Sequence, residues 1–509
     1  MKESNINKIY GSAKIRYFCW QRYYEVRGRV KFTLNICRPI SMHRANISNL
    51  VFICLILLAF SWSCRKADKT DSSPSLMLSF SVDTVMFDTV LTTVGSVTKR
   101  LLVYNRNKNK VVVSQIQLGG GSGSMYRMNV DGTAAYSVQN TEIRGNDSLY
   151  IFVKVTVNPN DKNTPFIVSD SIVFMTNTNR QVVQLAALGQ NADFNIAKTL
   201  KGNIVWDSLK AHVIYGFLRV DTGASLTVLP GTKIYFHKNA YLAVSHEASL
   251  AVNGTWEHPV RMQSDRLDFY YRDLPGQWEG IYLERGSKNN NLSYAVIKNG
   301  NYGLIIDSLV SGSDPKLTMD GTIIQNMVYD GIYAYSTSVV STNCIIGDCG
   351  GAALRIEKGG NYNFKQLSVG NYWSSSVRSI PSMILSNYTS DSVGIKHPND
   401  LAANFGNIIL YGTETDELEL DSVANIKFSY IFDHALLRTS LKVSNQAHYL
   451  ECIVNKDPLF LDVQKFDYEI DSLSPARGSG GAMGVNNDIR GSQRPSPPSL
   501  GAYEYFKKP

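Results

Sequence analysis

The feature that most constrains this chain is a pair of apolar residues, two positions apart, that recurs about every eight residues in its middle part. Alternation with a period of two is typical of β-strands. The pairs begin at Leu218, Leu226, Ile234, Leu242, Leu250 and Val260, so four equal steps are followed by a slightly longer one. Three steps make one coil, so we expect Leu218 to stack on Leu242 and Leu226 on Leu250. Coils of three short strands predict a right-handed parallel β-helix.

A second repeat follows downstream. Four apolar segments align at spacings of about one coil and begin at Gly280, Gly303, Gly331 and Ala353. The last three are preceded by Asn299, Asn326 and Asp348. Asn and Asp side chains at a corner bond to the turn backbone and, when stacked, to each other. We therefore predict a structural ladder of these three residues at one corner of the coils.

The first folded unit is predicted to be a β-sandwich over residues 77–192. Apolar residues alternate with polar ones from Leu78 to Val82, and turn-forming Asn, Gly, Asp and Pro separate the later apolar runs. Those runs lie at 101–104, 111–113, 149–157, 172–174 and 182–188. About seven strands in about 110 residues favour an immunoglobulin-like sandwich. The fold class is therefore all-β, with this sandwich followed by the β-helix over 195–505.

Three segments carry resemblances to known families. The sandwich ends in SDSIVFMTNTNRQVVQLAALGQ, which resembles domains related to cilium and sperm-tail proteins and implies a spacer or a protein-contact module. GASLTVLPGTKIYF and EASLAVNGT are near-copies that resemble coils of secreted bacterial β-helix proteins. NIILYGTETDELEL, DPLFLD, SLSPARGSG and DIRGSQRPSPPSLGAYEY follow in that order and resemble the end of polysaccharide-lyase-like members of the pectate-lyase-like superfamily. The last resemblance implies a C-terminal cap on the β-helix.

The leader predicts export. From Met42, a short basic start precedes an eleven-residue apolar run at 50–60, which suits a signal peptide over 42–63 and is short for a spanning helix. Ser61-Trp62-Ser63-Cys64 resembles the lipobox of bacterial lipoproteins, although Trp62 is bulkier than that pattern prefers. The resemblance implies lipidation of Cys64 and a lipid-anchored protein of a Gram-negative outer membrane. The alternative is an uncleaved anchor helix.

Two segments flank this leader. We interpret residues 1–41 as an incorrectly assigned extension upstream of a true start at Met42, because a signal peptide does not normally carry such a prefix. Residues 64–76 are polar and rich in Ser, as in a flexible tether. The segment before Cys64 holds ten of the 51 Lys and Arg and two of the 43 Asp and Glu, which leaves 41 of each. A neutral mature chain gives no electrostatic basis for nucleic-acid binding.

The remaining cysteines, Cys344, Cys349 and Cys452, allow at most one disulfide once Cys64 is lipidated. The spacing of Cys344 and Cys349 does not match a zinc site, because no second pair or nearby His completes it. We interpret both as small buried residues. The pairing of the three stays open.

The candidate binding surface follows from the second repeat. If its apolar residues point inward, two outward columns result: Tyr282, Ile305, Tyr333 and Arg355, and Glu284, Asp307, Tyr335 and Glu357. Tyrosine rings stack on sugar rings, and charged groups bond to hydroxyls or pair with uronates. Excluding Ile305, we take these residues as ligand-binding candidates. The structural alternative is an ordinary solvent-facing sheet.

Three functions stay open. The leading interpretation is a non-catalytic protein that binds carbohydrate or another surface partner. The second is a polysaccharide lyase or glycoside hydrolase, in which Tyr333 or Arg355 would be the base, Glu357 a further catalytic candidate, and Glu284, Asp307 and Glu357 could bind Ca²⁺. The third is a structural, adhesin-like stalk. No catalytic residue is assigned by the sequence, because no set matches a known signature.

Overall fold

The computed structural model describes residues 69–160, 165–309 and 315–506. Cys64, the leader and residues 1–41 lie outside the described residues. The described part is built from strands, with two short 3-10 turns at Gly121–Gly123 and Val463–Lys465. Among the described residues, no helix long and apolar enough to cross a membrane is found.

The first folded unit is a sandwich of two five-stranded sheets around one apolar core. One sheet has the order β1 (Ser79–Phe80), β3 (Lys99–Asn105), β8 (Asp147–Val155), β5 (Tyr126–Val130) and β6 (Thr133–Ala135). The other has the order β2 (Thr84–Leu91), β10 (Asn179–Gln190), β9 (Phe166–Thr176), β4 (Val111–Leu118) and β7 (Ser137–Ile143). Strands β2 and β10 pair in parallel, whereas the other neighbours are antiparallel.

The sandwich begins before the predicted boundary at residue 77. Leu76 is buried in its core, and the side chains of Asn177 and Asn179 donate to the carbonyls of Ser73 and Pro74 at 2.7 and 2.5 Å. The sequence did not indicate this earlier boundary, because a polar segment that hydrogen-bonds to a sheet has the same composition as a flexible linker. The immunoglobulin-like assignment itself stays a prediction.

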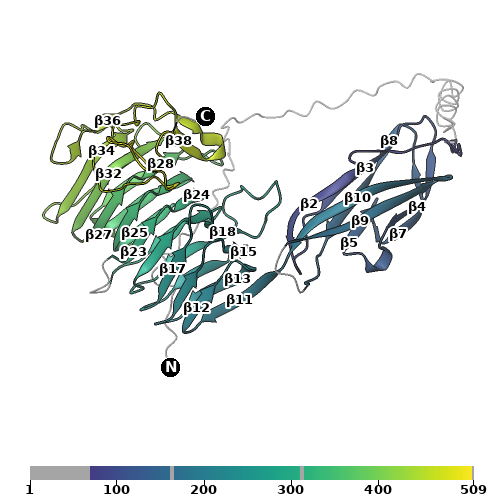
Figure 1. Cartoon of the computed structure of the whole chain (residues 1–509), viewed down its shortest axis with the longest axis horizontal. Helices are drawn as coiled ribbons and strands as arrows, with labels where there is room; N and C mark the ends of the chain where they lie inside the picture. The colour runs from purple at the N-terminus through teal and green to yellow at the C-terminus, as the bar shows by residue number, and fades with distance from the viewer. Residues whose placement is uncertain (1–68, 161–164, 310–314, 507–509) are drawn as a thin grey trace, which may run out of the picture. The chain divides into compact units, whose positions relative to one another are not determined.

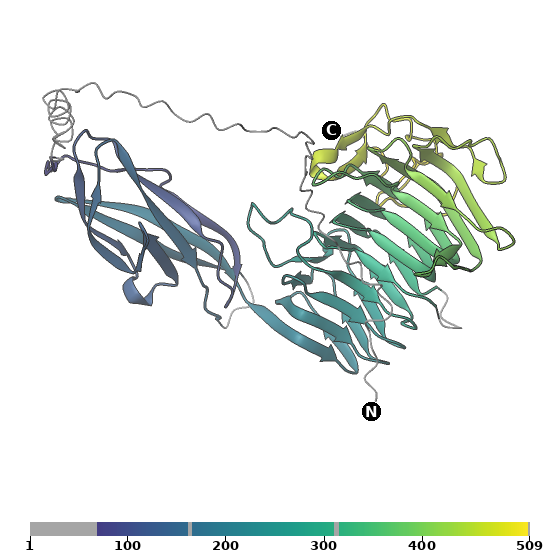
Figure 2. The same cartoon turned by 180° about the vertical axis from the view of Figure 1, so that it is seen from behind.

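The second unit is a parallel β-helix, whose rungs are visible from opposite sides in Figures 1 and 2. It starts at β11 (Ala192–Leu200), slightly before the predicted start at 195, because β11 already pairs with β13 (Ala211–Val220). The predicted stacking is confirmed: Leu218 pairs with Leu242, and Leu226 with Leu250. Inward residues form one continuous apolar core.

The strands stack in three faces. The first, which we call the tyrosine face, holds the second half of β13, β16 (Tyr241–Val244), β19 (Gly280–Leu283), β22 (Leu304–Ile306), the first halves of β25 (Ile332–Thr342) and β27 (Leu354–Lys365), β29 (Met383–Ser386) and β33 (Leu418–Asp421). The predicted register from Ile281 to Leu354 is confirmed on this face.

The second face continues from the first around each coil. It holds β12 (Asn203–Trp206), β14 (Ser225–Val228), β17 (Ser249–Asn253), β20 (Asn290–Ser293), β23 (Leu317–Asp320), the second halves of β25 and β27, the first halves of β32 (Leu401–Gly412) and β34 (Phe428–Leu437), and β35 (Tyr449–Leu450).

The third face, which we call the covered face, closes each coil. It holds the first half of β13, β15 (Lys233–Phe236), β18 (Val260–Ser264), β21 (Ala295–Lys298), β24 (Ile323–Met327), β26 (Ile345–Cys349), β28 (Ser368–Asn371), the second halves of β32 and β34, and β36 (Ile453–Val454). A hairpin of β30 (Tyr388–Ser390) and β31 (Lys396–Pro398) leaves the coils after β29.

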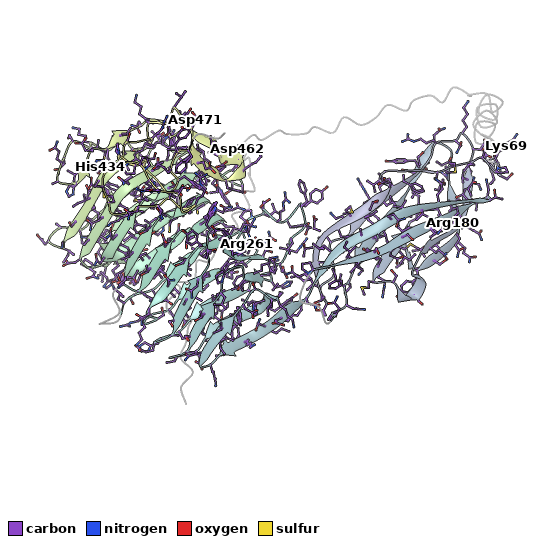
Figure 3. All side chains as sticks on the ribbon, in the orientation of Figure 1. Lys69, Arg180, Arg261, His434, Asp462 and Asp471 are labelled. Atoms are coloured by element: carbon purple, nitrogen blue, oxygen red, sulfur yellow. The ribbon has the colours of Figure 1, made fainter. Side chains whose placement is uncertain are left out.

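Residues 456–506, the C-terminal segment, contain β37 (Phe460–Asp462) and β38 (Asp467–Ile470). They pack on outward apolar residues of the covered face, where Ile345 meets Tyr468, and Ile409 and Leu436 meet Ile470. The predicted cap therefore covers a side of the late coils. Figure 3 shows Asp462 and Asp471 of this segment beside those coils.

The tyrosine of β38 explains two glycines under the C-terminal segment. A Cβ on Gly370 would lie 2.3 Å from Cε1 of Tyr468, and one on Gly347 would lie 2.7 Å from its hydroxyl. Two small residues are therefore needed where the ring docks. Cys344 and Cys349 are buried as predicted, and both, with Cys452, are free thiols.

Candidate functional site

The predicted outward columns lie on the tyrosine face in the predicted register. Row one runs through consecutive Cα partners from strand to strand: Arg219, Ala243, Tyr282, Ile305, Tyr333, Arg355, Ile384 and Glu419. Row two continues that register two positions later: Glu284, Asp307, Tyr335, Glu357, Ser386 and Asp421. The seven candidate residues are all half-buried, so each presents part of its side chain to solvent.

The charged groups at the early end of the face neutralise one another. Arg219 Nη1 donates to both carboxylate oxygens of Glu284 at 2.7 Å and to the Ser245 hydroxyl at 3.0 Å. Burial lowers the pKa of Arg219, but its hydrogen bond and charge interaction with Glu284 outweigh this, so the net shift is upward. The guanidinium therefore stays charged and tied to row two.

Tyr333 is bound to Glu357 across neighbouring strands. Its hydroxyl donates to Glu357 Oε2 at 2.8 Å, and Thr389 of the hairpin donates to Oε1. Burial raises the pKa of Tyr333, and the charge and hydrogen bond of Glu357 raise it further. A phenolate that would accept a substrate proton is thus disfavoured here, and the role of Tyr333 as a base stays a prediction.

Arg355 is held by a residue outside both rows. Its Nε and Nη2 donate to Asp330 at 2.7 and 3.2 Å, and Asp330 also accepts the backbone N–H of Ala352 at 2.7 Å. Burial lowers the pKa of Arg355, but the hydrogen bonds and charge of Asp330 raise it by more. The guanidinium is thus held in its charged form, which disfavours proton acceptance, and the role of Arg355 as a base stays a prediction.

The three carboxylates proposed for Ca²⁺ do not converge. Glu284 pairs with Arg219, Glu357 accepts from Tyr333 and Thr389, and Asp307 accepts its own neighbour's backbone N–H, from Ser308, at 2.5 Å. No group of three or more His, Cys, Asp or Glu placed to hold a metal ion is found within the described ranges. The Ca²⁺ site of the lyase alternative stays a prediction.

A buried lysine supports the turn after row two. Lys316 has no solvent exposure, and its ammonium donates to the carbonyls of Glu284, Asp307 and Ser308 at 2.8, 2.6 and 3.2 Å. Burial lowers its pKa to about 8, against the opposing charges of Asp307 and Glu284. All three N–H groups of the ammonium donate to backbone carbonyls. Lys316 therefore fixes the backbone at Glu284 and Asp307.

An aromatic loop, residues 265–279, leaves the stack between β18 and β19. Phe269, Tyr270 and Tyr271 are 63%, 74% and 38% exposed. Arg266 lies over the ring of Tyr271, 3.6 Å from its centre. The loop leads directly into β19, which carries Tyr282. It therefore lies at the N-terminal ends of the strands of the tyrosine face. Exposed rings on an anchored loop present apolar surface at low entropic cost.

The predicted corner ladder anchors that loop. Asn326 Nδ2 donates to Asn299 Oδ1 at 2.8 Å, and Asn299, Asn326 and Asp348 all have positive φ, which Asn and Asp tolerate at turns. Asn299 and Asn326 also donate to the loop carbonyls of Arg272 and Asp273, at 2.5 and 2.8 Å. The ladder is therefore confirmed for the two asparagines, whereas Asp348 accepts from Tyr468.

The opposite edge of the face is bordered by the β30–β31 hairpin. Thr389 binds Glu357, and Tyr388 donates to Asp421 Oδ2 at 2.5 Å. Lys396 lies over the ring of Tyr388, 3.9 Å from its centre. The hairpin is thus fixed to row two in two coils, and it narrows the exposed part of the late face.

Sequence reasoning missed Arg219, Asp330 and Thr389. Arg219 was missed because the aromatic loop lengthens one coil: Leu242 pairs with Ile281, much further along the chain than one regular coil, which hid the continuity of the two repeats. The signal was that Leu218, next to Arg219, belongs to the first repeat. Asp330 stands just before the repeated Gly331, a position that the alignment of segments could have marked. No local pattern signals the contact of Thr389.

One comparison with known protein families agrees with the fold of the early coils. Residues 198–314 match the family model described as a pectate-lyase like beta helix domain. Among solved structures, a family 123 glycoside hydrolase from Clostridium perfringens aligns with 24% of this chain and 30% of its own, at 10% identity and a TM-score of 0.18. This chain thus spans less than a third of that enzyme, and such a likeness carries no argument. No curated protein matches the sequence.

Proposed function

We propose that this chain is a lipid-anchored protein of a bacterial cell envelope whose tyrosine face binds carbohydrate without cleaving it. The observation that carries the proposal is the pair of aligned rows, in which the half-exposed rings of Tyr282, Tyr333 and Tyr335 stand beside hydrogen-bonding carboxylates. Tyrosine rings and carboxylates together match the apolar faces and the hydroxyls of sugars. The match of the early coils to a pectate-lyase like family model supports a carbohydrate-related role.

The proposed absence of cleavage rests on the state of the charged groups. A general base must accept a proton near its working pH, and Tyr333 and Arg355 both have pKa values shifted upward by burial or bonded carboxylates. Both are also already engaged, with Glu357 and Asp330. These are properties of a preorganised surface.

Binding and cleavage are separated by one experiment. The full-length protein in detergent micelles is run by affinity electrophoresis through gels that contain neutral or acidic polysaccharides, and the same mixtures are assayed for new reducing ends and unsaturated uronates. Retention without product is the expected result. Product from any substrate would overturn the non-catalytic proposal, and no retention on a broad panel would favour the stalk.

Two variants locate the site. Tyr282→Ala should weaken retention about tenfold, because it removes a stacking ring. Val340→Ala is the control, because Val340 lies on β25 like Tyr333 but faces outward on the second face. Equal loss in both variants would argue against a site on the tyrosine face.

The anchor is tested separately. Cys64→Ser should abolish incorporation of labelled fatty acid and move the protein from the membrane to the soluble fraction, because one residue carries the proposed lipid. Cys452→Ser is the control, since Cys452 is a partly exposed free thiol. Membrane retention of unlabelled Cys64→Ser protein would support the uncleaved anchor helix.

A further inference from the structure

The charges of the tyrosine face are unevenly distributed between its two rows. Row two carries four carboxylates, at Glu284, Asp307, Glu357 and Asp421, and its described members include no cation. Row one carries two guanidinium groups, Arg219 and Arg355, and one further carboxylate at its late end. Within the two rows, carboxylates therefore outnumber cations five to two, although Lys316 and Lys358 lie beside row two.

The carboxylates of row two repeat along the direction in which the strands stack. Neighbouring strands are about 4.8 Å apart, and row two places a carboxylate on β27 and on the coils of β19, β22 and β33. By strand count, Glu284 and Asp307 are about 4.8 Å apart and the other neighbouring carboxylates about 9.6 Å apart, below or slightly above the Debye length of about 8 Å at physiological ionic strength. A polyuronate laid along the rows would therefore meet like charges that salt screens incompletely.

The two cations of row one are already paired with carboxylates. Arg219 is bound to Glu284 and Arg355 to Asp330, each at 2.7 Å. Lys358 follows row two and lies over the ring of Tyr335, 5.3 Å from its centre. Arg285 stands on an exposed turn beyond Glu284. Because a carboxylate already neutralises each row-one arginine, a uronate would gain less from pairing with either of them.

We infer that the ligand of this face is an uncharged polysaccharide, an inference that rests on the proposed function and names its substrate class. Sugar hydroxyls are donors, and row two presents acceptors: carboxylates accept strongly from hydroxyl groups. Asp307 keeps acceptor capacity, since the only hydrogen bond found for its carboxylate within the described ranges comes from Ser308 N–H. Tyr282 adds a half-exposed ring for the apolar face of a sugar residue. Acceptors plus a ring, with the row-one cations already paired, match a neutral glycan.

The experiment compares classes of polymer on one protein. Full-length protein in detergent micelles is titrated by affinity electrophoresis with neutral β-glucan and mannan, with polygalacturonate and alginate with and without Ca²⁺, and with chitosan. Neutral polymers should retard the protein equally at low and high salt, because no net charge is exchanged. Asp307→Asn should weaken that retardation about fivefold, since it replaces a charged acceptor by a neutral one. Glu257→Gln, at an exposed turn after β17, should leave it unchanged.

The outcomes separate the inference from its premise. Retardation by polygalacturonate or alginate at least as strong as by neutral polymers, with or without Ca²⁺, would overturn the inference and leave carbohydrate binding standing. Retardation by chitosan alone would do the same. If no polymer retards the protein, the proposed function fails and the inference fails with it. If Asp307→Asn and Glu257→Gln changed the retardation equally, row two would not be part of the binding site, and the inference would be contradicted.

Discussion

The tyrosine face and the covered face belong to the same coils but differ in what they turn outward. On the covered face, Ile345, Ile409 and Leu436 point out and are buried beneath the C-terminal segment. On the tyrosine face, Tyr282 and Tyr333 occupy the equivalent outward positions and stay half-exposed. Inward residues of both faces join one core. The comparison teaches that inward residues specify the coil, whereas outward residues determine whether the chain covers a face itself or leaves it accessible.

The prediction with the largest expected effect replaces one tyrosine at each of the two faces. Tyr468→Ala should lower the free energy of unfolding by about 3–5 kcal/mol, because it removes a buried ring and leaves a cavity over Gly347 and Gly370. Tyr282→Ala should cost less than about 1 kcal/mol, since that ring is half-exposed. Chemical unfolding followed by circular dichroism measures both. Similar losses would mean that the tyrosine face is stabilised as a core is.

A buried carboxyl group on the covered face should also make the free energy of unfolding depend on pH. Burial raises the pKa of Asp348 from 3.8 to about 7, although its hydrogen bond from Tyr468 lowers it. A pKa raised by folding contributes stability that is complete below about pH 4 and is lost as pH rises through about 7. The loss should be on the order of 4 kcal/mol.

That pH dependence is assigned to Asp348 by difference. Asp348→Asn should remove the fall in unfolding free energy between about pH 4 and about pH 7 while it keeps an acceptor for the Tyr468 hydroxyl. Denaturant titrations at several pH values provide the measurement. Arg261→Ala is the control, because Arg261 is exposed on β18 and far along the chain from the C-terminal segment (Figure 3). An unchanged pH profile in Asp348→Asn would place the titrating group elsewhere.

A smaller effect is expected within the tyrosine face. Tyr333→Phe deletes the 2.8 Å hydrogen bond to Glu357 and should cost about 1 kcal/mol. Thr389 still donates to Glu357, so the carboxylate keeps one partner. Unfolding experiments at neutral pH would detect the change. A loss as large as that of Tyr468→Ala would show that Tyr333 organises the face.

The smallest effect concerns the ion pair at the early end. Arg219→Ala should change the unfolding free energy by less than about 1 kcal/mol, because both partners are partly exposed and solvent screens their attraction. Addition of salt should reduce even this difference. Thermal unfolding at two ionic strengths tests it, and a large loss independent of salt would contradict the interpretation of this pair as a surface one.

The coil repeat was predictable because it depends on local alternation, and the pairing of Ile281 with Leu304 and of Leu304 with Ile332 confirms it. The outward rows follow from the same period. Their partners were not predictable, because the contacts of Arg355 with Asp330 and of Tyr333 with Glu357 span about one coil and depend on side-chain geometry. The edge strand β7 was also missed, because its mostly polar residues show no regular alternation of apolar and polar side chains.

The two asparagines at the corner have a consequence for the order of folding. Asn299 and Asn326 hold the backbone of the loop at Arg272 and Asp273, from coils that are synthesised after it. The loop therefore precedes, along the chain, the side chains that fix it. It acquires its final shape only when the second of those coils has stacked, so the order of the loop reports how far assembly of the β-helix has advanced.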